Sequence, residues 1–221
     1  MTVLHTEGIG MTSRRTRERM INRLIDQGIS NEAVLNAMRQ VPRHLFVDDA
    51  LASRSYEDTA LPIGHGQTIS QPYIVAKMIE LLIGNKELKT ILEIGTGCGY
   101  QAAVLGQLAE QVYTVERIKP LYKQAKQRLG QLNITNIKYL HSDGAWGWSE
   151  GSSFDGIIVA AAPAEIPESL LKQMTIGGVM LIPIGERRDN QVLKRITRTL
   201  SGYETEILEP VSFVPFLGGV S

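Results

Sequence analysis

The feature that most constrains this chain is a short, largely apolar run that ends in three closely spaced glycines. Residues 91–94 have the character of a core strand. Gly95, Gly97 and Gly99 follow that strand directly. Glycine adopts backbone angles that a side chain forbids, and it lets a ligand approach the bare main chain. We therefore predict the first strand of a nucleotide-binding α/β unit, followed by a turn that receives a nucleoside cofactor.

The spacing of the glycines separates two classes of cofactor. A dinucleotide-binding turn, G-x-G-x-x-G/A, requires Gly or Ala at position 100, where this chain has Tyr100. The pattern is instead E-x-G-x-G-x-G, and it resembles motif I of the S-adenosylmethionine-dependent methyltransferases. The cofactor contacts predicted from this motif are Glu93, Gly95, Thr96, Gly97 and Gly99. A glycine-rich turn that binds nothing is the alternative, and three glycines directly after a strand disfavour it.

Length and charge limit the possible partners. With 221 residues the chain can form one α/β domain with a full core, and a second domain would be cramped. Lys plus Arg and Asp plus Glu number 23 each, so no net field favours nucleic acid or a membrane surface. No apolar run is as long as a membrane span, and the first residues lack a signal-peptide pattern. We expect a cytoplasmic monomer that binds neither nucleic acid nor membrane.

Two amphipathic helices are predicted ahead of the sheet. Residues 1–11 show no periodic pattern and are expected to form a flexible arm. One helix is predicted from residue 12 or 13 to Gly28, and another from near Ser30 to Val41. Both are short, and we expect them to cover a larger sheet rather than to fold alone.

A basic run and a long polar segment accompany these helices. The run consists of Arg14, Arg15, Arg17 and Arg19, and in a neutral protein we interpret it as a solvated helix face. Residues 42–72 have no clear helical or strand period, and a polar segment of this length favours a functional loop. Pro72 is expected to open the next helix.

Strand-like runs alternate with helical patterns over the rest of the chain. The predicted strands are 90–94, 111–116, 137–141, 154–160, 179–183, 192–199 and 204–213, with helices over 99–109 and from near Pro120 and Pro167. Such alternation implies parallel pairing with right-handed crossovers. We predict an α/β fold with a doubly wound, mostly parallel, seven-stranded Rossmann-like sheet. Residues 12–221 form one domain: 12–89 hold the N-terminal helices and an acceptor-site loop, and 90–221 hold the cofactor-binding sheet and the C-terminal strands.

Two acidic residues lie at strand ends on the predicted rim of the sheet, where ligands of doubly wound folds bind. Glu116 ends the second strand, 21 positions after the first motif glycine, where a carboxylate can accept both ribose hydroxyls. Its alternative role is a surface carboxylate paired with Arg117 or Lys119. Asp143 and Gly144 follow the third strand, where Asp143 can bind an adenine amino group. Asp-Gly is also an ordinary turn signal.

Other chemically versatile residues are assigned no role in the site. His65 lies between two glycines, but no acidic residue at a telling spacing orients it, and the other three histidines make no metal-binding pattern. The single cysteine, Cys98, excludes an intrachain disulfide and is expected to be packed in a tight loop. Trp146 and Trp148 are expected either to stack on a base or to pack beneath the sheet edge. No metal site is expected.

Motifs spread over nearly the whole chain resemble one family. The glycine motif is shared by many methyltransferases, whereas G-Q-T-I-S-Q-P, residues 66–72, is specific to the protein-L-isoaspartate O-methyltransferases. The likeness runs from about residue 12 to 217. Its other segments are V-P-R-x-x-F-V (41–47), A-L-P-I-G (60–64), L-E-I-G-T-G-C-G-Y (92–100), V-E-R (115–117), D-G (143–144), F-D-x-I-I-V (154–159) and F-V-P-F (213–216).

The resemblance implies a repair reaction. A methyl group passes from S-adenosylmethionine to the free α-carboxyl of L-isoaspartyl residues in damaged proteins and peptides, and S-adenosylhomocysteine is left. The ester then closes to a succinimide, and hydrolysis returns some normal aspartyl residues. The resemblance also implies that the last two strands of the usual methyltransferase sheet are swapped.

The resemblance further assigns roles to particular residues. The functional serine of its T-I-S motif falls on Ser70. Cofactor contacts fall on Gln71, Pro72, Tyr73, Ile74, Gly95, Glu116, Asp143 and Gly144. Substrate contacts are placed at Ile63, Thr68, Ile69, Val214 and Pro215, and the segment 211–216 is expected to offer main chain to an extended peptide.

A carboxylate acceptor needs no catalytic base, because its reference pKa of about 4 leaves it ionised at pH 7. We therefore predict that Ser70 is not a nucleophile but donates a positioning hydrogen bond to the acceptor or forms part of a lid. It is also a candidate cap for the helix that opens at Pro72, and both roles are compatible. Two other functions stay open. One is methylation of a small-molecule carboxylate or hydroxyl, and the other is a binding module that senses the cofactor without turnover.

Overall fold

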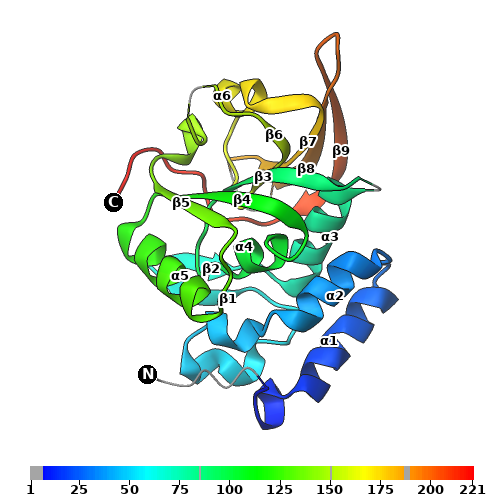
Figure 1. Cartoon of the computed structure of the whole chain (residues 1–221), viewed down its shortest axis with the longest axis vertical. Coiled ribbons are helices and arrows are strands. Elements are labelled where there is room, and N and C mark those ends of the chain that lie inside the picture. Colours follow the sequence, from blue (N-terminus) through cyan, green and yellow to red (C-terminus); the bar gives the residue numbers. More distant parts are fainter. Residues whose placement is uncertain (1–6, 85, 150, 187–189) are drawn as a thin grey trace.

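A seven-stranded sheet runs through the molecule (Figure 1). The computed structural model describes residues 7–84, 86–149, 151–186 and 190–221. The strands of the sheet are β3 (Leu88–Ile94), β4 (Ala109–Glu116), β5 (Ile137–His141), β6 (Phe154–Val159), β7 (Met174–Ile184), β8 (Gln191–Arg198) and β9 (Tyr203–Val211). Their order is β5-β4-β3-β6-β7-β8-β9, and the first five pair in parallel. The predicted doubly wound sheet is confirmed.

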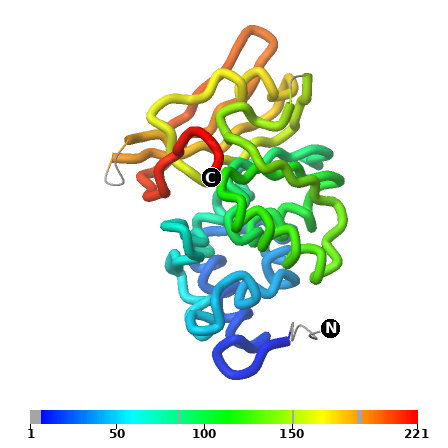
Figure 2. Tube along the Cα trace, turned by 90° about the vertical axis from the view of Figure 1, so that its left-hand side faces the viewer, coloured from blue at the N-terminus to red at the C-terminus, as the bar shows by residue number. Residues whose placement is uncertain are grey.

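The last three strands follow one another in chain order. β8 pairs antiparallel with both β7 and β9, so β9 is the edge strand. This order agrees with the swap that the family resemblance implies. The β8–β9 hairpin projects at one end of the molecule, and the N-terminal segments lie at the other (Figure 2).

Alternate residues of β3 face two apolar cores. Ile91 packs with α3 (Pro72–Ile83) and α4 (Tyr100–Leu105), and α5 (Lys119–Gln131) adds Leu129 to the same core. Leu92 and Ile94 pack in the second core with Leu170 of α6 (Glu168–Lys172). A strand that is buried on both faces carries an almost continuous apolar run, which is the pattern of residues 91–94.

Helix α4 is shorter than its pattern predicted. It ends at Leu105 rather than near residue 109, because β4 is already paired with β3 at Ala109, opposite Leu88. Pairing in the sheet therefore overrides the helical pattern at these positions. No helix in the described ranges combines the length and the apolar character needed to cross a lipid bilayer.

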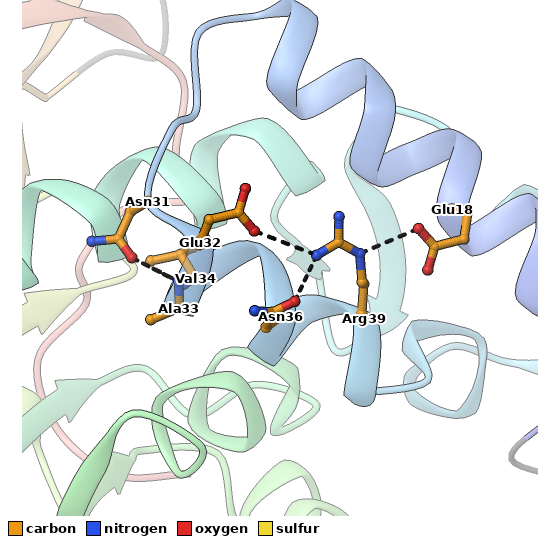
Figure 3. Close-up of polar contacts among 7 residues, drawn as sticks. All are labelled: Glu18, Asn31, Glu32, Ala33, Val34, Asn36 and Arg39. Carbon is orange, nitrogen blue, oxygen red and sulfur yellow. Dashed lines mark hydrogen bonds and ion pairs between the residues drawn. The ribbon is translucent and has the colours of Figure 1, made fainter.

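The two N-terminal helices are confirmed as α1 (Arg14–Asp26) and α2 (Glu32–Gln40). Ser13 caps α1 by accepting from the N–H of Thr16. Asn31 caps α2 through the N–H groups of Ala33 and Val34 (Figure 3). The sequence had placed the start of this helix near Ser30, two residues before its first helical residue. Both caps satisfy main-chain donors that have no partner inside a helix.

Arginine side chains tie α1 to α2. The Nε atom of Arg39 lies 3.2 Å from a carboxylate oxygen of Glu18 on α1 (Figure 3). Arg17 is 7% exposed and donates to the Tyr56 hydroxyl (3.0 Å) and to the main-chain carbonyl of Arg39 (2.7 Å). The predicted solvated face is therefore wrong for Arg17, whereas Arg14, Arg15 and Arg19 are exposed as predicted.

The predicted N-terminal arm lies partly outside the described residues, which begin at Glu7. Gly10–Thr12 form a short 3-10 helix, η1, directly before α1. Regular structure thus begins two residues earlier than the sequence pattern indicated.

Residues 42–72 contain short elements that the sequence did not predict. Two 3-10 helices, η2 (Arg43–Phe46) and η3 (Asp49–Arg54), precede a hairpin of β1 (Leu61–Gly64) and β2 (Gln67–Ile69). Each element is too short to produce a periodic signal. The hairpin brings residues 67–71 to the carboxyl edge of the large sheet, next to the glycine turn.

Candidate active site

The turn after β3 presents bare main chain at the edge of the sheet. Gly95, Gly97 and Gly99 have positive φ angles of 94°, 54° and 90°, which other residues adopt only with strain. A Cβ on Gly97 would touch only the end of the Ile63 side chain, at 3.3 Å. A Cβ on Gly99 would lie 3.0 Å from Leu129 of α5. Gly97 therefore keeps the site open, and Gly99 allows the turn to pack against a helix.

Glu116 lies at the end of β4 and braces this turn. Its Oε2 atom accepts from the N–H of Gly97 and its Oε1 atom accepts from the N–H of Ile118, both at 2.8 Å. The residue is 5% exposed, and within the described residues it forms no ion pair with Arg117 or Lys119. The surface-carboxylate alternative is therefore wrong. Each carboxylate oxygen retains acceptor capacity for a ligand hydroxyl.

Three cavities share walls along this edge of the sheet. The first has a volume of about 370 Å³ and shares Thr68, Ser70 and Ala160 with the second, of about 60 Å³. The second shares Gly95 and Glu116 with the third, of about 50 Å³. The cavities thus form a row that begins beside residues 210–214 and passes the glycine turn.

Most predicted site residues line this row. Ser70 and Thr68 line the first and second cavities. The first also contains Gln71, Ile74 and Val214; the second contains Ile69, Gly95, Thr96, Gly97 and Glu116; the third contains Gly95, Glu116, Gly144 and Pro215. Residues that the sequence placed in separate motifs are brought together at one edge of the sheet.

Ser70 lies on the wall between the first two cavities, and its hydroxyl forms no hydrogen bond to another described residue. Its main-chain carbonyl accepts from Arg43 at 2.7 Å. The N-cap position of α3 is Gln71, and no side chain caps that helix. The capping role predicted for Ser70 is therefore wrong, and its hydroxyl is available to a ligand.

Some predicted residues line none of the three cavities: Ile63, Pro72, Tyr73, Glu93, Gly99 and Asp143. Pro72 is buried in the first turn of α3, and the N–H of Tyr73 donates to Asp58 at 2.9 Å. Ile63 covers Gly97 from outside the turn. Ligand contact by Ile63, Pro72 and Tyr73 stays a prediction.

Glu93 lies beneath the turn and is fully buried. Its carboxyl accepts from the Thr114 hydroxyl at 2.5 Å and from the Gln101 amide at 3.1 Å, and the Thr114 hydroxyl also contacts that of Thr96 at 2.6 Å. Burial raises the pKa of Glu93 to about 8. The carboxyl thus supports the turn from behind through Thr114 and Thr96, and its predicted contact with the cofactor stays a prediction.

Asp143 is bonded through both carboxylate oxygens. Oδ1 accepts from the N–H of Ala145 at 2.8 Å, and Oδ2 accepts from the N–H of Gly219 at 2.6 Å. Ser221 also pairs with the main chain of Arg117 and Lys119. Residues 217–221 therefore lie against the ends of β4 and β5. Each carboxylate oxygen of Asp143 can accept one more hydrogen bond. The contact with an adenine amino group therefore stays a prediction that depends on this remaining capacity.

Two residues of this region were missed by sequence reasoning. Gln191 lines the first cavity; its Oε1 atom accepts from the N–H of Phe213 at 2.6 Å and its Nε2 atom donates to the Phe213 carbonyl at 3.2 Å. This pair holds the segment that carries Val214. Arg43 lies behind Ser70. The V-P-R motif contained Arg43 without indicating its role, and no pattern singled out Gln191.

The residues that were assigned no role lie outside this arrangement or pack within the fold. His65 is exposed in the turn of the β1–β2 hairpin. Cys98 is 5% exposed, and burial raises the pKa of its thiol. Trp148 packs edge-on against Tyr113, and Trp146 is 70% exposed. Among the described residues, no three His, Cys, Asp or Glu side chains gather to hold a metal ion.

Comparison with known proteins establishes the family. The sequence model for the family described as protein-L-isoaspartate(D-aspartate) O-methyltransferase matches residues 15–221. The chain belongs to this family. A protein-L-isoaspartate O-methyltransferase of Cellvibrio japonicus is 56% identical over 223 residues, which cover 100% of both chains. The protein-L-isoaspartate O-methyltransferase 1 of Marinobacter nauticus is 57% identical over 214 residues, 97% of each chain.

Solved structures of protein-L-isoaspartate O-methyltransferases share the fold. One has a TM-score of 0.83 at 27% identity and covers 93% of this chain and 67% of its own. Another, from Plasmodium falciparum and described as putative, was solved in complex with S-adenosyl-L-homocysteine; its TM-score is 0.76 at 28% identity, covering 91% and 98%.

The protein-L-isoaspartate O-methyltransferase family defines the activity of this chain. The chain is an S-adenosylmethionine-dependent enzyme that methylates isoaspartyl residues and so begins their repair. The site fits this cofactor, because Gly95 and Gly97 line the second cavity with bare main chain and the braced carboxylate of Glu116 retains acceptor capacity. The family, the fold and the reaction predicted from the sequence are confirmed.

Proposed function

We propose that the row of cavities holds the cofactor and the isoaspartyl acceptor end to end, with Ser70 at their junction. The observation that carries this proposal is that Ser70 and Thr68 line both the first and the second cavity. The first cavity takes the acceptor and its neighbouring peptide. The second and third border the nucleoside part of the cofactor, with Glu116 bonding its ribose and Gly144 beside its base.

The residues of this site align and desolvate the acceptor. S-adenosylmethionine supplies an electrophilic methyl group on a sulfonium. The acceptor carboxylate is already ionised at neutral pH, so no residue has to remove a proton. Ser70 donates a hydrogen bond to that carboxylate and orients it for in-line displacement. Ala160, Ile74 and Phe213 form apolar parts of the wall and exclude water.

The segment 212–214 binds the peptide around the damaged residue. It leaves the sheet after β9, borders the first cavity and is held there by Gln191. The Val214 carbonyl accepts from the N–H of Ala162, so Val214 offers its N–H, and Pro215 its carbonyl and a rigid ring, to an extended peptide. Main-chain pairing reads few side chains, which suits an enzyme that repairs damage in many sequences.

We also propose that the enzyme works as a monomer in the cytoplasm, without a nucleic-acid or membrane partner. The equal numbers of basic and acidic residues support this proposal. Sedimentation at several protein concentrations tests the monomer.

A paired-peptide assay tests the function. The protein is incubated with methyl-labelled S-adenosylmethionine and two peptides that differ only in Asp or isoAsp at one position. We expect label on the isoAsp peptide alone. Equal labelling of both peptides would refute the acceptor assignment, and labelling of a metabolite extract but not of aged protein would favour a small-molecule acceptor.

A further inference from the structure

A buried arginine connects the acceptor segment to the glycine turn. Arg43 is 0% exposed. Its Nη2 atom donates to the carbonyl of Ser70 at 2.7 Å, and its Nε atom donates to the carbonyl of Ser55 at 2.8 Å. The guanidinium carbon lies 4.8 Å from the centre of the Tyr100 ring. One side chain thus contacts the segment before Ser70, Ser70 itself and the first residue of α4.

The charge of this guanidinium is not neutralised by an ion pair with any described residue. Its Nη1 atom is buried and has no hydrogen-bond partner among them, and the same holds for the Tyr100 hydroxyl. Burial raises the pKa of Tyr100 to about 12, so this hydroxyl carries no compensating charge at neutral pH. A guanidinium keeps its proton in proteins, although burial lowers the pKa of Arg43.

Asp58 is the acidic residue whose field reaches Arg43, and its carboxylate is bound elsewhere. Its oxygens accept from the N–H of Tyr73 (2.9 Å) and from the Gln27 amide (2.8 Å). A buried charge without a paired counter-charge is costly. The fold therefore retains a positive charge directly behind the wall that the first and second cavities share.

We propose that Arg43 is a positioning residue for the acceptor carboxylate: it fixes the main chain of Ser70 and places behind it a positive charge that has no ion-pair partner among the described residues. This inference rests on the proposed role of Ser70. The two bonds to carbonyls hold the segment in register, and the cation favours an anionic acceptor in the adjoining cavity. A charge that acts through low-dielectric protein rather than water retains much of its effect.

The experiment separates this role from a purely structural one. Arg43→Met removes the charge with little change in volume, Arg43→Lys retains the charge without the planar fork, and Arg54→Met is the matched control. Arg54 lies in the same segment but is exposed and pairs with Glu57 at 3.0 Å. Replacing a buried charge by an apolar side chain of similar size need not destabilise the fold, and a thermal melt checks each variant.

The readout is the preference for a carboxylate ligand. Binding of two isoaspartyl peptides, one with the free α-carboxylate and one with an α-carboxamide, is measured in the presence of S-adenosylhomocysteine. In Arg43→Met we expect the carboxylate preference to fall by about tenfold, with cofactor affinity changed less than about twofold. Arg43→Lys should keep most of the preference, and Arg54→Met all of it.

Two results would overturn the proposal. One is an unchanged carboxylate preference in Arg43→Met. The other is an equal loss of affinity for both peptides, which would make Arg43 a structural residue only. If Arg43→Met does not fold, the comparison of Arg43→Lys with Arg43→Gln decides in the same way. The paired-peptide assay uses the unaltered enzyme. A negative result there would refute the proposed function, whereas a negative result with the Arg43 variants would refute only the role of Arg43.

Discussion

The cofactor side and the acceptor side of this site are built by different means. On the cofactor side, the bond from Gly97 to Glu116 at 2.8 Å lies within one β-α-β unit, which runs from β3 through α4 to β4. On the acceptor side, the bonds from Arg43 to Ser70 and between Gln191 and Phe213 join separate segments of the chain. The glycine turn and Glu116 belong to one β-α-β unit, whereas the acceptor side combines residues 43–70 with residues 191–214.

Because of this difference, we expect substitutions on the two sides to affect different steps, cofactor binding and acceptor binding. The glycine turn is fixed by backbone angles and by a carboxylate that two N–H groups orient, so changes there should act on cofactor affinity. The acceptor wall is assembled from η2, β2 and the segment after β9, so changes there should act on the acceptor. Substitutions that separate the two effects test the comparison.

The largest effect is expected for Glu116→Ala. The substitution removes the acceptor of the Gly97 and Ile118 N–H groups as well as the ribose ligand. Hydrogen bonds to charged groups contribute about 1.5 to 3 kcal/mol each, so the Kd for S-adenosylhomocysteine should rise about 10- to 100-fold. Calorimetry measures this, with Glu110→Ala at the other end of β4 as control. An unchanged Kd would remove the ribose assignment.

A pair of glycine variants should separate stability from binding within the turn. Gly99→Ala places a Cβ 3.0 Å from Leu129 at a φ of 90°, and we expect it to reduce the free energy of unfolding by about 2 kcal/mol. The Cβ of Gly97→Ala meets only the flexible end of Ile63, so this variant should lose about 1 kcal/mol of unfolding free energy. It should nevertheless raise the Kd for the cofactor more than Gly99→Ala does. Denaturant unfolding and calorimetry on both variants check this, and the reverse pattern would contradict it.

Ser70→Ala should affect the acceptor side. We expect kcat to fall by about tenfold, which corresponds to the loss of one positioning hydrogen bond, while cofactor affinity changes little. Steady-state kinetics with an isoaspartyl peptide gives kcat, and calorimetry gives the Kd for the cofactor. Ser201→Ala, in the exposed turn between β8 and β9, is the control. A larger loss in cofactor affinity than in kcat would place Ser70 on the cofactor side.

The buried carboxyl of Glu93 should make stability depend on pH. Burial raises the pKa of Glu93 to about 8 from an ordinary value of 4.5. Between these values the folded protein holds a proton that the unfolded chain has lost, so the free energy of unfolding should fall as pH rises and level off above pH 8. One such group contributes at most about 1.4 kcal/mol per pH unit. Urea unfolding at pH 6, 7 and 8 should show the slope, and Glu93→Gln should lack it.

The cofactor side could be predicted from the sequence because its signals are local. The strand before Gly95, the glycine spacing and the strand-end position of Glu116 each follow from a few neighbouring residues, and Gly95, Gly97 and Glu116 line the second cavity. For Glu93 the motif did not show that the side chain is buried beneath the turn. Its place in a strand that is buried on both faces aims the carboxyl into the core, and a motif does not show that direction.

The acceptor side could be predicted only from the family motifs. Periodicity gave no element between residues 42 and 72, because η2, η3, β1 and β2 span only three to six residues each. Arg17 shows the same limit. Its basic neighbours favour a solvated face, but a hydrogen bond to Tyr56, 39 positions away in the chain, buries it.

The sequence by itself determined the alternation of strands and helices, the glycine turn, and a family likeness strong enough to name the reaction. These depend on residue type and spacing over short distances, where backbone sterics and hydrophobic periodicity act. Only the tertiary structure showed that the Ser70 hydroxyl is available to a ligand and that Gln191 holds the segment 212–214 beside the first cavity. It also showed that the charge of Arg43 lies behind the wall shared by the first and second cavities. Such features arise from hydrogen bonds between distant segments, and no local pattern encodes them.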